Sequence, residues 1–149
     1  VVIANEEDCE SVFGISAGDV TKGELDRQRY LDVAGKVLAR FPAVSQVAIT
    51  LRESHSASRN GWSGVLVARD GHAFGPRYEL DVIDRVGGGD SFAAGLIHAM
   101  IAGKTREQAI GWAVAASALK HSIVGDFNLI SAAEVDALVA GDGSGRVQR

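Results

Sequence analysis

The chain has 149 residues, of which 46% are hydrophobic and 23% charged, which is typical of a single folded domain with a substantial core. Its formal net charge of −4 argues against nucleic acid as a partner, and no apolar run approaches the roughly 18 residues that predict a membrane-spanning helix. Cys9 is the only cysteine, so an internal disulfide is excluded and a reducing cytoplasm is expected.

The first third of the chain alternates strand and helix patterns. It opens in an apolar run, and acidic residues follow where a helix N-terminus favours negative charge. A later set of apolar residues recurs at helical spacing and stops before Pro42. The predicted elements are a strand at 1–4, a short helix ending at Phe13-Gly14, a loop at 16–23, a helix at 24–40 and a strand at 44–50.

The middle of the chain predicts short strands, and three helices follow them. Asp70-Gly71 is a hairpin turn signal. Thr105 with Gln108, and Ser131 with Glu134, have the spacing of capping boxes at helix starts. The predicted elements are a polar loop at 55–64, strands at 65–68, 72–74 and 78–83, and helices at 91–102, 106–121 and 131–139.

The order of these elements predicts an α/β fold. Because the chain opens directly in a strand-like run without a methionine, we expect it to be the later part of a longer protein. One domain is expected over residues 1–139. Residues 140–149 are rich in Gly, Ser and charge, and a flexible tail is expected there.

The most informative stretch is Gly87-Gly88-Gly89, which lies between a predicted strand and a predicted helix. Glycines let the backbone turn sharply, and the first N–H groups of a helix attract anions such as phosphate. Asp90 follows directly. A carboxylate repels phosphate, and this conflict is tolerable if the carboxylate accepts a proton from a hydroxyl that is about to receive a phosphoryl group. The simpler alternatives are a tight turn and an acidic first helical turn.

Two nucleotide-binding motifs can be rejected. Gly103-Lys104-Thr105 resembles the end of a Walker loop, but His98 stands where that loop needs its first glycine. The three glycines at 87–89 fail the dinucleotide-binding pattern because Phe92 stands at its last glycine position.

Three further polar residues are candidates at the same sheet edge. Asn5 and Asp8 are three residues apart in a predicted first helical turn and are oxygen ligands that suit Mg²⁺ through water, or simply helix caps. Thr50 ends a predicted strand and could bind phosphate or cap that strand. The four histidines have no ligand-like spacing and are expected to be structural.

The stretch from Asp84 to Phe92 resembles the C-terminal signature of the ribokinase-like (PfkB) carbohydrate kinases, and its Asp-Arg-x-Gly-Gly-Gly-Asp form looks most like the 2-keto-3-deoxygluconate (KDG) kinase branch. Residues 50–54, 121–122 and 125–128 also look like stretches of those kinases. The resemblance implies a ribokinase-like, Rossmann-type three-layer α/β/α fold. By it, this chain holds the C-terminal part of the sheet with its helices, and the N-terminal half and lid are absent.

The resemblance also implies roles for individual residues. Asp90 matches the general base, and the three glycines match the anion hole. Asn5 and Asp8 match a motif that positions Mg²⁺, although Asp8 is shorter than the usual Glu. Thr50 matches a phosphate-contacting residue. Arg52 is also expected in the nucleotide site, although Arg52 replaces a glycine of the family's pattern.

Asp84 matches a residue that helps to hold a monovalent cation, such as K⁺, in many members of the family. The resemblance also implies adenine binding beside the helix with Ala115, Ala116 and Ala118, although a tightly packed helix would have the same small residues.

The function implied is transfer of the γ-phosphoryl group of ATP to a sugar acid in the cytoplasm, with KDG as the expected substrate and its 6-hydroxyl as the acceptor. No membrane partner is expected, and the lid region could form a homo-oligomer. Because the sugar-binding half is missing, the chain alone is expected to be inactive. A fructokinase-like or ribokinase-like enzyme, or a non-catalytic nucleotide-binding fragment, remain the alternatives.

Overall fold

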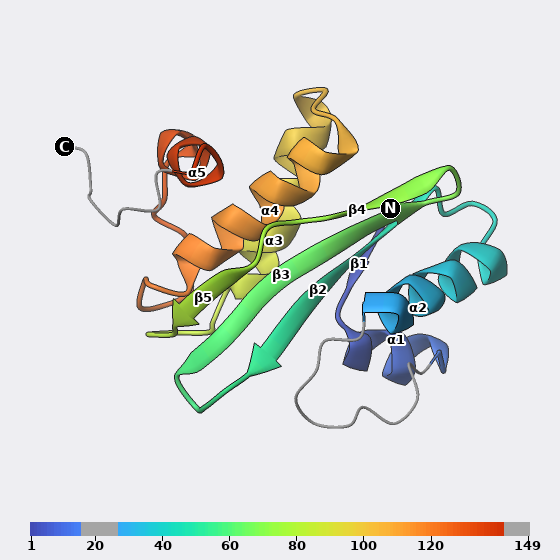
Figure 1. Ribbon diagram of the computed structural model, residues 1–149, viewed down its shortest axis with the longest axis horizontal. Coiled ribbons are helices and arrows are strands. Elements are labelled where there is room, and N and C mark those ends of the chain that lie inside the picture. Colours follow the sequence, from blue (N-terminus) through green and yellow to red (C-terminus); the bar gives the residue numbers. More distant parts are fainter. Residues whose placement is uncertain (16–26, 142–149) are drawn as a thin grey trace.

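A computed structural model describes residues 1–15 and 27–141 of the chain, and a five-stranded mixed sheet runs through its middle (Figure 1). The predicted loop at 16–23 and residues 142–149 of the predicted tail lie outside the described residues. The strands are β1 (Val2–Ala4), β2 (Gln46–Ser54), β3 (Arg59–Ala68), β4 (Gly71–Phe74) and β5 (Tyr78–Asp81).

Among the described strands, β1 and β2 alone pair in parallel. There Ala4 lies opposite Ile49, whereas the long β2 and β3 form an antiparallel hairpin. The short β4 and β5 both pair with β3, β4 along its last residues and β5 along its first. The carboxyl ends of β1, β2 and β5 therefore point toward the same end of the sheet.

Helices cover both faces of the sheet, as expected for a three-layer α/β/α fold (Figure 1). On one face lie α1 (Glu6–Phe13) and α2 (Arg27–Arg40). On the other lie α3 (Gly88–Ile101), α4 (Arg106–Lys120) and α5 (Ala132–Val139).

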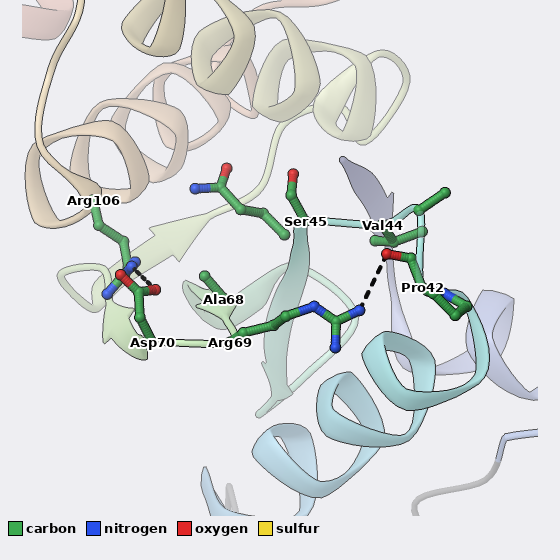
Figure 2. A pocket seen from close by; sticks show the side chains of 9 residues that line it. Pro42, Val44, Ser45, Ala68, Arg69, Asp70 and Arg106 are labelled. Carbon is green, nitrogen blue, oxygen red and sulfur yellow. Dashed lines mark hydrogen bonds and ion pairs between the residues drawn. The ribbon is translucent and has the colours of Figure 1, made fainter.

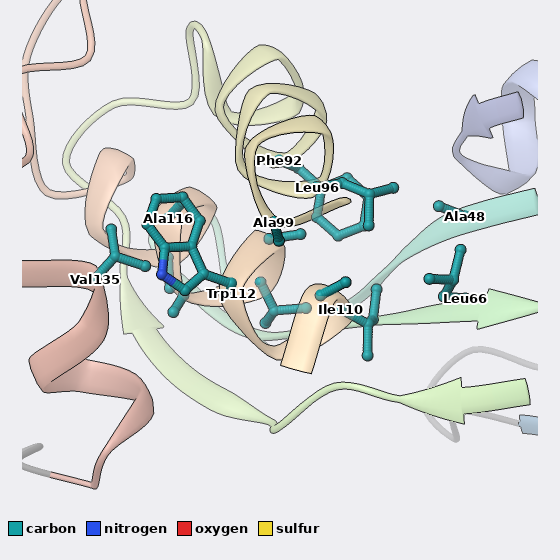
Figure 3. Packing of buried hydrophobic residues seen from close by; sticks show 14 of the residues in the cluster. Ala48, Leu66, Phe92, Leu96, Ala99, Ile110, Trp112, Ala116 and Val135 are labelled. Carbon is teal, nitrogen blue, oxygen red and sulfur yellow. The ribbon is translucent and has the colours of Figure 1, made fainter. Parts of the chain in front are cut away.

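The alternation of side chains along β2 divides the core into two parts. Val47, Ile49 and Leu51 belong to the cluster under α1 and α2, whereas Ala48 belongs to the cluster under α3 and α4. Figure 3 shows this second cluster, in which Phe92 and other apolar residues of α3 pack against α4 and the sheet.

Gly95 brings α3 close to α4. A Cβ placed on Gly95 would stand 3.0 Å from Ala116 Cβ, so α3 and α4 touch almost backbone to backbone. The predicted capping boxes at Thr105 and Ser131 are also present and begin α4 and α5. These local signals succeed because a cap needs only residues within one helical turn.

Two predicted boundaries in the hairpin are wrong. The strand expected to end at Thr50 continues to Ser54, and the loop expected at 55–64 is strand from Arg59 onward. The polar composition of 55–64 is misleading because Asn60 and Ser63 are almost completely buried. Ser63 satisfies its hydroxyl by donating to the carbonyl of Gly75 at 3.1 Å, a bond that only the folded sheet can supply.

Candidate functional site

The glycine corner joins β5 to α3, but only Gly87 lies in the turn. Its φ of 75° is left-handed, and it is the N-cap of α3, which begins at Gly88. The prediction that the helix starts near Ser91 is therefore wrong by three residues. Gly87 has no side chain to cap the helix, so the N–H groups of Gly89 and Asp90 have no N-cap side chain to which they could donate.

The three glycines have different surroundings. A Cβ on Gly87 would lie 2.7 Å from the carbonyl oxygen of Asp126, and one on Gly88 would lie 2.8 Å from His121 Cε1. No atom of the described residues would lie within 4 Å of a Cβ on Gly89. Gly87 and Gly88 are therefore required by the protein's own packing, whereas the space beside Gly89 is open to a ligand.

Asp90 lies in the first turn of α3, and its side chain is exposed. The positive end of the helix dipole stabilises a carboxylate at this position. The structure therefore places an accessible carboxylate one residue after the open Gly89, as a base beside an anion site requires.

The segment before the corner is held by the loop after α4. Beyond β5, the N–H groups of Ile83 and Asp84 both donate to the carbonyl of His121, at 2.9 and 3.2 Å. The Asp84 carboxylate accepts from the N–H of Val86 at 3.0 Å and from that of Gly125 at 2.8 Å. These two backbone bonds, with the charge of Lys120, hold the pKa of Asp84 below its usual range.

Asn5 and Asp8 form a capping box at the start of α1. Asn5 Oδ1 accepts from the N–H of Asp8 at 2.7 Å, and Asp8 Oδ2 accepts from the N–H of Asn5 at 3.0 Å. This is the helix-cap arrangement that the spacing also predicted, and it engages one oxygen of each side chain. Asn5 directly follows Ala4, whose partner in β2 is Ile49, so Asn5 lies at the strand end next to Thr50.

Thr50 and Arg52 lie within β2, on the face of the sheet that carries α3 and α4, since they alternate with residues of the opposite face. Thr50 pairs with Gly64, where a Cβ would stand 2.9 Å from the Phe92 ring of α3. The sheet therefore places Thr50 one strand away from the contact with α3.

His121 was expected to be structural, and its ring packs directly against Gly88. Its ring is buried and lies 4.8 Å from that of Trp62, centroid to centroid. Nδ1 is 2.7 Å from the carbonyl oxygen of Ser117, which can only accept, so this nitrogen carries the proton. Burial lowers the pKa of His121, and the charges of three cations, including Arg52, lower it further.

Lys120 and Asn128 also belong to the site's framework. Asn128 lies in a stretch that resembles the KDG kinases, but the sequence predicted no role for either residue. Asn128 Nδ2 donates to the Ser91 hydroxyl at 2.8 Å, which ties the segment before α5 to the first turn of α3. The available signal for Lys120 was a charged residue within an alanine-rich helix. In that helix Ala115, Ala116 and Ala118 are buried in the core, which agrees with the tightly packed alternative.

A separate cavity lies elsewhere in the described part of the chain. It measures about 370 Å³ and is lined by residues at the start of β2 and the end of β3, opposite the glycine corner (Figure 2). Its cations are already engaged. Arg106 pairs with Asp70, and Arg69 donates to the carbonyls of Leu38 and Pro42. Because the glycine corner combines open space with helix N–H groups and a carboxylate, we take the corner as the candidate site.

Comparison with known proteins shows the family to which the chain belongs. The model of the family described as pfkB family carbohydrate kinase matches residues 1–130. The 2-dehydro-3-deoxygalactonokinase of Haloferax volcanii is 31% identical over 143 residues, which are 92% of this chain and 42% of that protein.

Solved structures are similar as well. The 2-dehydro-3-deoxygluconokinase from Thermotoga maritima is 42% identical with a TM-score of 0.85, and the match covers 93% of this chain and 41% of that one. Ribokinase from the same organism shares the fold, with a TM-score of 0.67 at 22% identity and coverage of 93% and 41%.

The chain belongs to the pfkB family of carbohydrate kinases, as its signature predicted, and its fold is the ribokinase-like α/β fold. It spans about two fifths of the length of the relatives named above. None of the helices in the described part of the chain is long and apolar enough to cross a membrane. Within residues 1–15 and 27–141, no three His, Cys, Asp or Glu side chains gather to hold a metal ion.

Proposed function

We propose that this chain is the phosphate-handling part of a cytoplasmic, ATP-dependent kinase that phosphorylates a 2-keto-3-deoxy sugar acid, with KDG as substrate and its 6-hydroxyl as acceptor. The observation that carries the proposal is the start of α3, where open space beside Gly89 adjoins uncapped helix N–H groups and the exposed Asp90. The 42% identity to a protein named 2-dehydro-3-deoxygluconokinase supports the choice of substrate.

In the proposed reaction Asp90 accepts the proton of the sugar hydroxyl, whose oxygen attacks the γ-phosphorus of ATP. The bond between that phosphorus and the bridging oxygen breaks, and ADP leaves. The helix N–H groups and the positive end of the α3 dipole stabilise the charge of the transferring phosphoryl group. Catalysis of this kind depends mainly on positioning and electrostatics.

Mg²⁺ would neutralise charge on the phosphates of ATP. Asn5 and Asp8 are the candidates to hold it. Each offers hard oxygen chemistry, and Mg²⁺ sites in such enzymes use one or two carboxylates together with waters and substrate phosphates. The capping box engages one carboxylate oxygen of Asp8, and the other oxygen of this exposed residue suits a water-mediated contact.

Thr50 and Arg52 are proposed to contact the nucleotide from β2, on the face of the sheet that carries α3. The relatives extend well beyond the length that this chain matches, so we propose that sugar-binding groups lie in a further part of a longer enzyme. On that basis the 149-residue chain alone should not turn over, and any oligomer would form through the further part.

The test is a coupled assay of ADP release with the longer enzyme against a panel of 2-dehydro-3-deoxygluconate, 2-dehydro-3-deoxygalactonate, fructose and ribose. The proposal expects the highest kcat/KM with the first compound. A preference for its galactonate epimer would change the sugar assignment, and one for fructose or ribose would overturn the sugar-acid class. Binding of ATP without transfer to any of the four would overturn the kinase assignment.

A further inference from the structure

Lys120, the last residue of α4, is a buried cation directly behind the glycine corner. Its exposure is 0%. Lysine is almost never fully buried unless its charge is compensated. Its stem runs under the turn, because a Cβ on Gly87 would lie 3.2 Å from Lys120 Cε.

The ammonium of Lys120 is held by carbonyl oxygens that accept its hydrogen bonds. Nζ donates to the carbonyl of Gly125 at 2.7 Å and to that of Ile123 at 3.1 Å, which satisfies two of its three N–H groups. Gly125 in turn donates its own N–H to Asp84 at 2.8 Å. A single peptide segment thus links the buried ammonium on one side to the carboxylate before the corner on the other.

Carbonyl oxygens that converge on one positive charge, with a carboxylate nearby, are the ligand set of a site for a hard cation. The resemblance to the family implies such a site for a monovalent cation beside Asp84. In this chain these oxygens do not fit a free cation, because the carbonyls of Ile123 and Gly125 already bind the ammonium. A K⁺ ion added there would face a second positive charge at close range.

We propose that the Lys120 ammonium takes the place of a monovalent cation in this protein, as a tethered ion that fixes the loop after α4 against the glycine corner. The corner then keeps its shape without K⁺. Lys120 acts as a positioning residue, through Gly125 and Asp84. Only the effect of Lys120 on catalysis rests on the proposed function, since the contacts of Lys120 involve neither ATP nor sugar.

The test measures thermal unfolding of the 149-residue chain by circular dichroism, in chloride salts of K⁺, Na⁺ and tetramethylammonium at equal ionic strength. Tetramethylammonium is too large for a site of this kind and reports salt effects alone. The variants are Lys120→Ala, which removes the ammonium and leaves room for an ion, and Lys36→Met, which removes an exposed lysine of α2 as the control.

We expect the same unfolding midpoint in all three salts for the wild type and for Lys36→Met. Lys120→Ala should unfold at a lower temperature and should recover part of the loss in a saturable way with K⁺, but not with tetramethylammonium. Thallium NMR supplies a second readout, in which Tl⁺ should bind Lys120→Ala and not the wild type.

Two results would overturn the proposal: saturable stabilisation of the wild type by K⁺, or a folded Lys120→Ala that neither K⁺ nor Tl⁺ affects. If Lys120→Ala does not fold, the wild type decides, because its indifference to K⁺ supports the proposal and a K⁺ requirement contradicts it. The measurement contains no substrate, so failure of the kinase assignment would leave its outcome unchanged.

Discussion

The ring of His121 lies directly against Gly88, so that a Cβ on Gly88 would stand 2.8 Å from His121 Cε1 and 3.1 Å from Nε2. At Gly89, one residue later, a Cβ would have no neighbour within 4 Å in the part of the chain that the structure describes. The loop after α4 therefore supports the first turn of α3 from one side only, and the other side is available to a ligand.

Replacing Gly88 with Ala should destabilise the protein by about 1–3 kcal/mol, because the new methyl group must push against a buried ring. Gly89→Ala is the matched control and should change the free energy of unfolding by at most about 1 kcal/mol, in the stabilising direction, since alanine suits a helix better than glycine. Urea unfolding of both variants checks this. Equal stabilities of the two variants would show that the His121 ring can shift at little cost in free energy.

Gly89 should affect the binding of ATP, whereas Gly88 should affect the stability of the fold. In the longer enzyme, Gly89→Val fills the open space beside the helix N–H groups and should weaken ATP binding while the fold is retained. Isothermal titration calorimetry measures the affinity, and circular dichroism checks the fold. An unchanged Kd in a folded variant would contradict the placement of phosphate at this point.

Asp90→Asn in the longer enzyme should lower kcat by about 10²-fold or more, because the amide cannot accept the hydroxyl proton. ATP affinity should not fall, since the change removes a charge that repels phosphate and adds no bulk. Steady-state kinetics and calorimetry separate the two effects. Turnover near the wild-type rate would remove Asp90 from the role of base.

Asp84 should make stability depend on pH. Its pKa in the fold is lowered by backbone N–H groups, so the folded state prefers the charged form. Its contribution is complete above the unfolded pKa of about 3.9 and is lost as pH falls through the folded value. The stability difference between wild type and Asp84→Asn, from urea unfolding, should therefore be large near neutrality and shrink below about pH 4. A difference that does not vary with pH would contradict this.

His121 should titrate below the pKa of about 6.5 found for exposed histidine, because burial disfavours the charged ring. The unfolded chain then takes up this proton more readily, so the contribution of His121 to stability should fall as pH drops below about 6.5. NMR titration of the ring reports both the pKa and the tautomer. A normal or raised pKa, or a proton on Nε2 with Nδ1 bare, would be incompatible with the bond to Ser117.

Sequence reasoning located most elements because their signals are local. The helix caps at Asn5, Thr105 and Ser131 each depend on residues within one turn, and all three are present. It failed for the hairpin because polarity is a poor guide to a strand whose polar groups are satisfied by distant partners. The bond from Ser63 to Gly75 spans 12 residues.

By itself the sequence determined the family, the position of the glycine corner between a strand and a helix, and the carboxylate that follows it, since these features are carried by consecutive residues. Only the tertiary structure decided which glycine is open, which are packed, and that Lys120 is a buried ion instead of a surface charge. Those properties depend on contacts such as that between Asp84 and Gly125, 41 residues apart, which no local pattern contains.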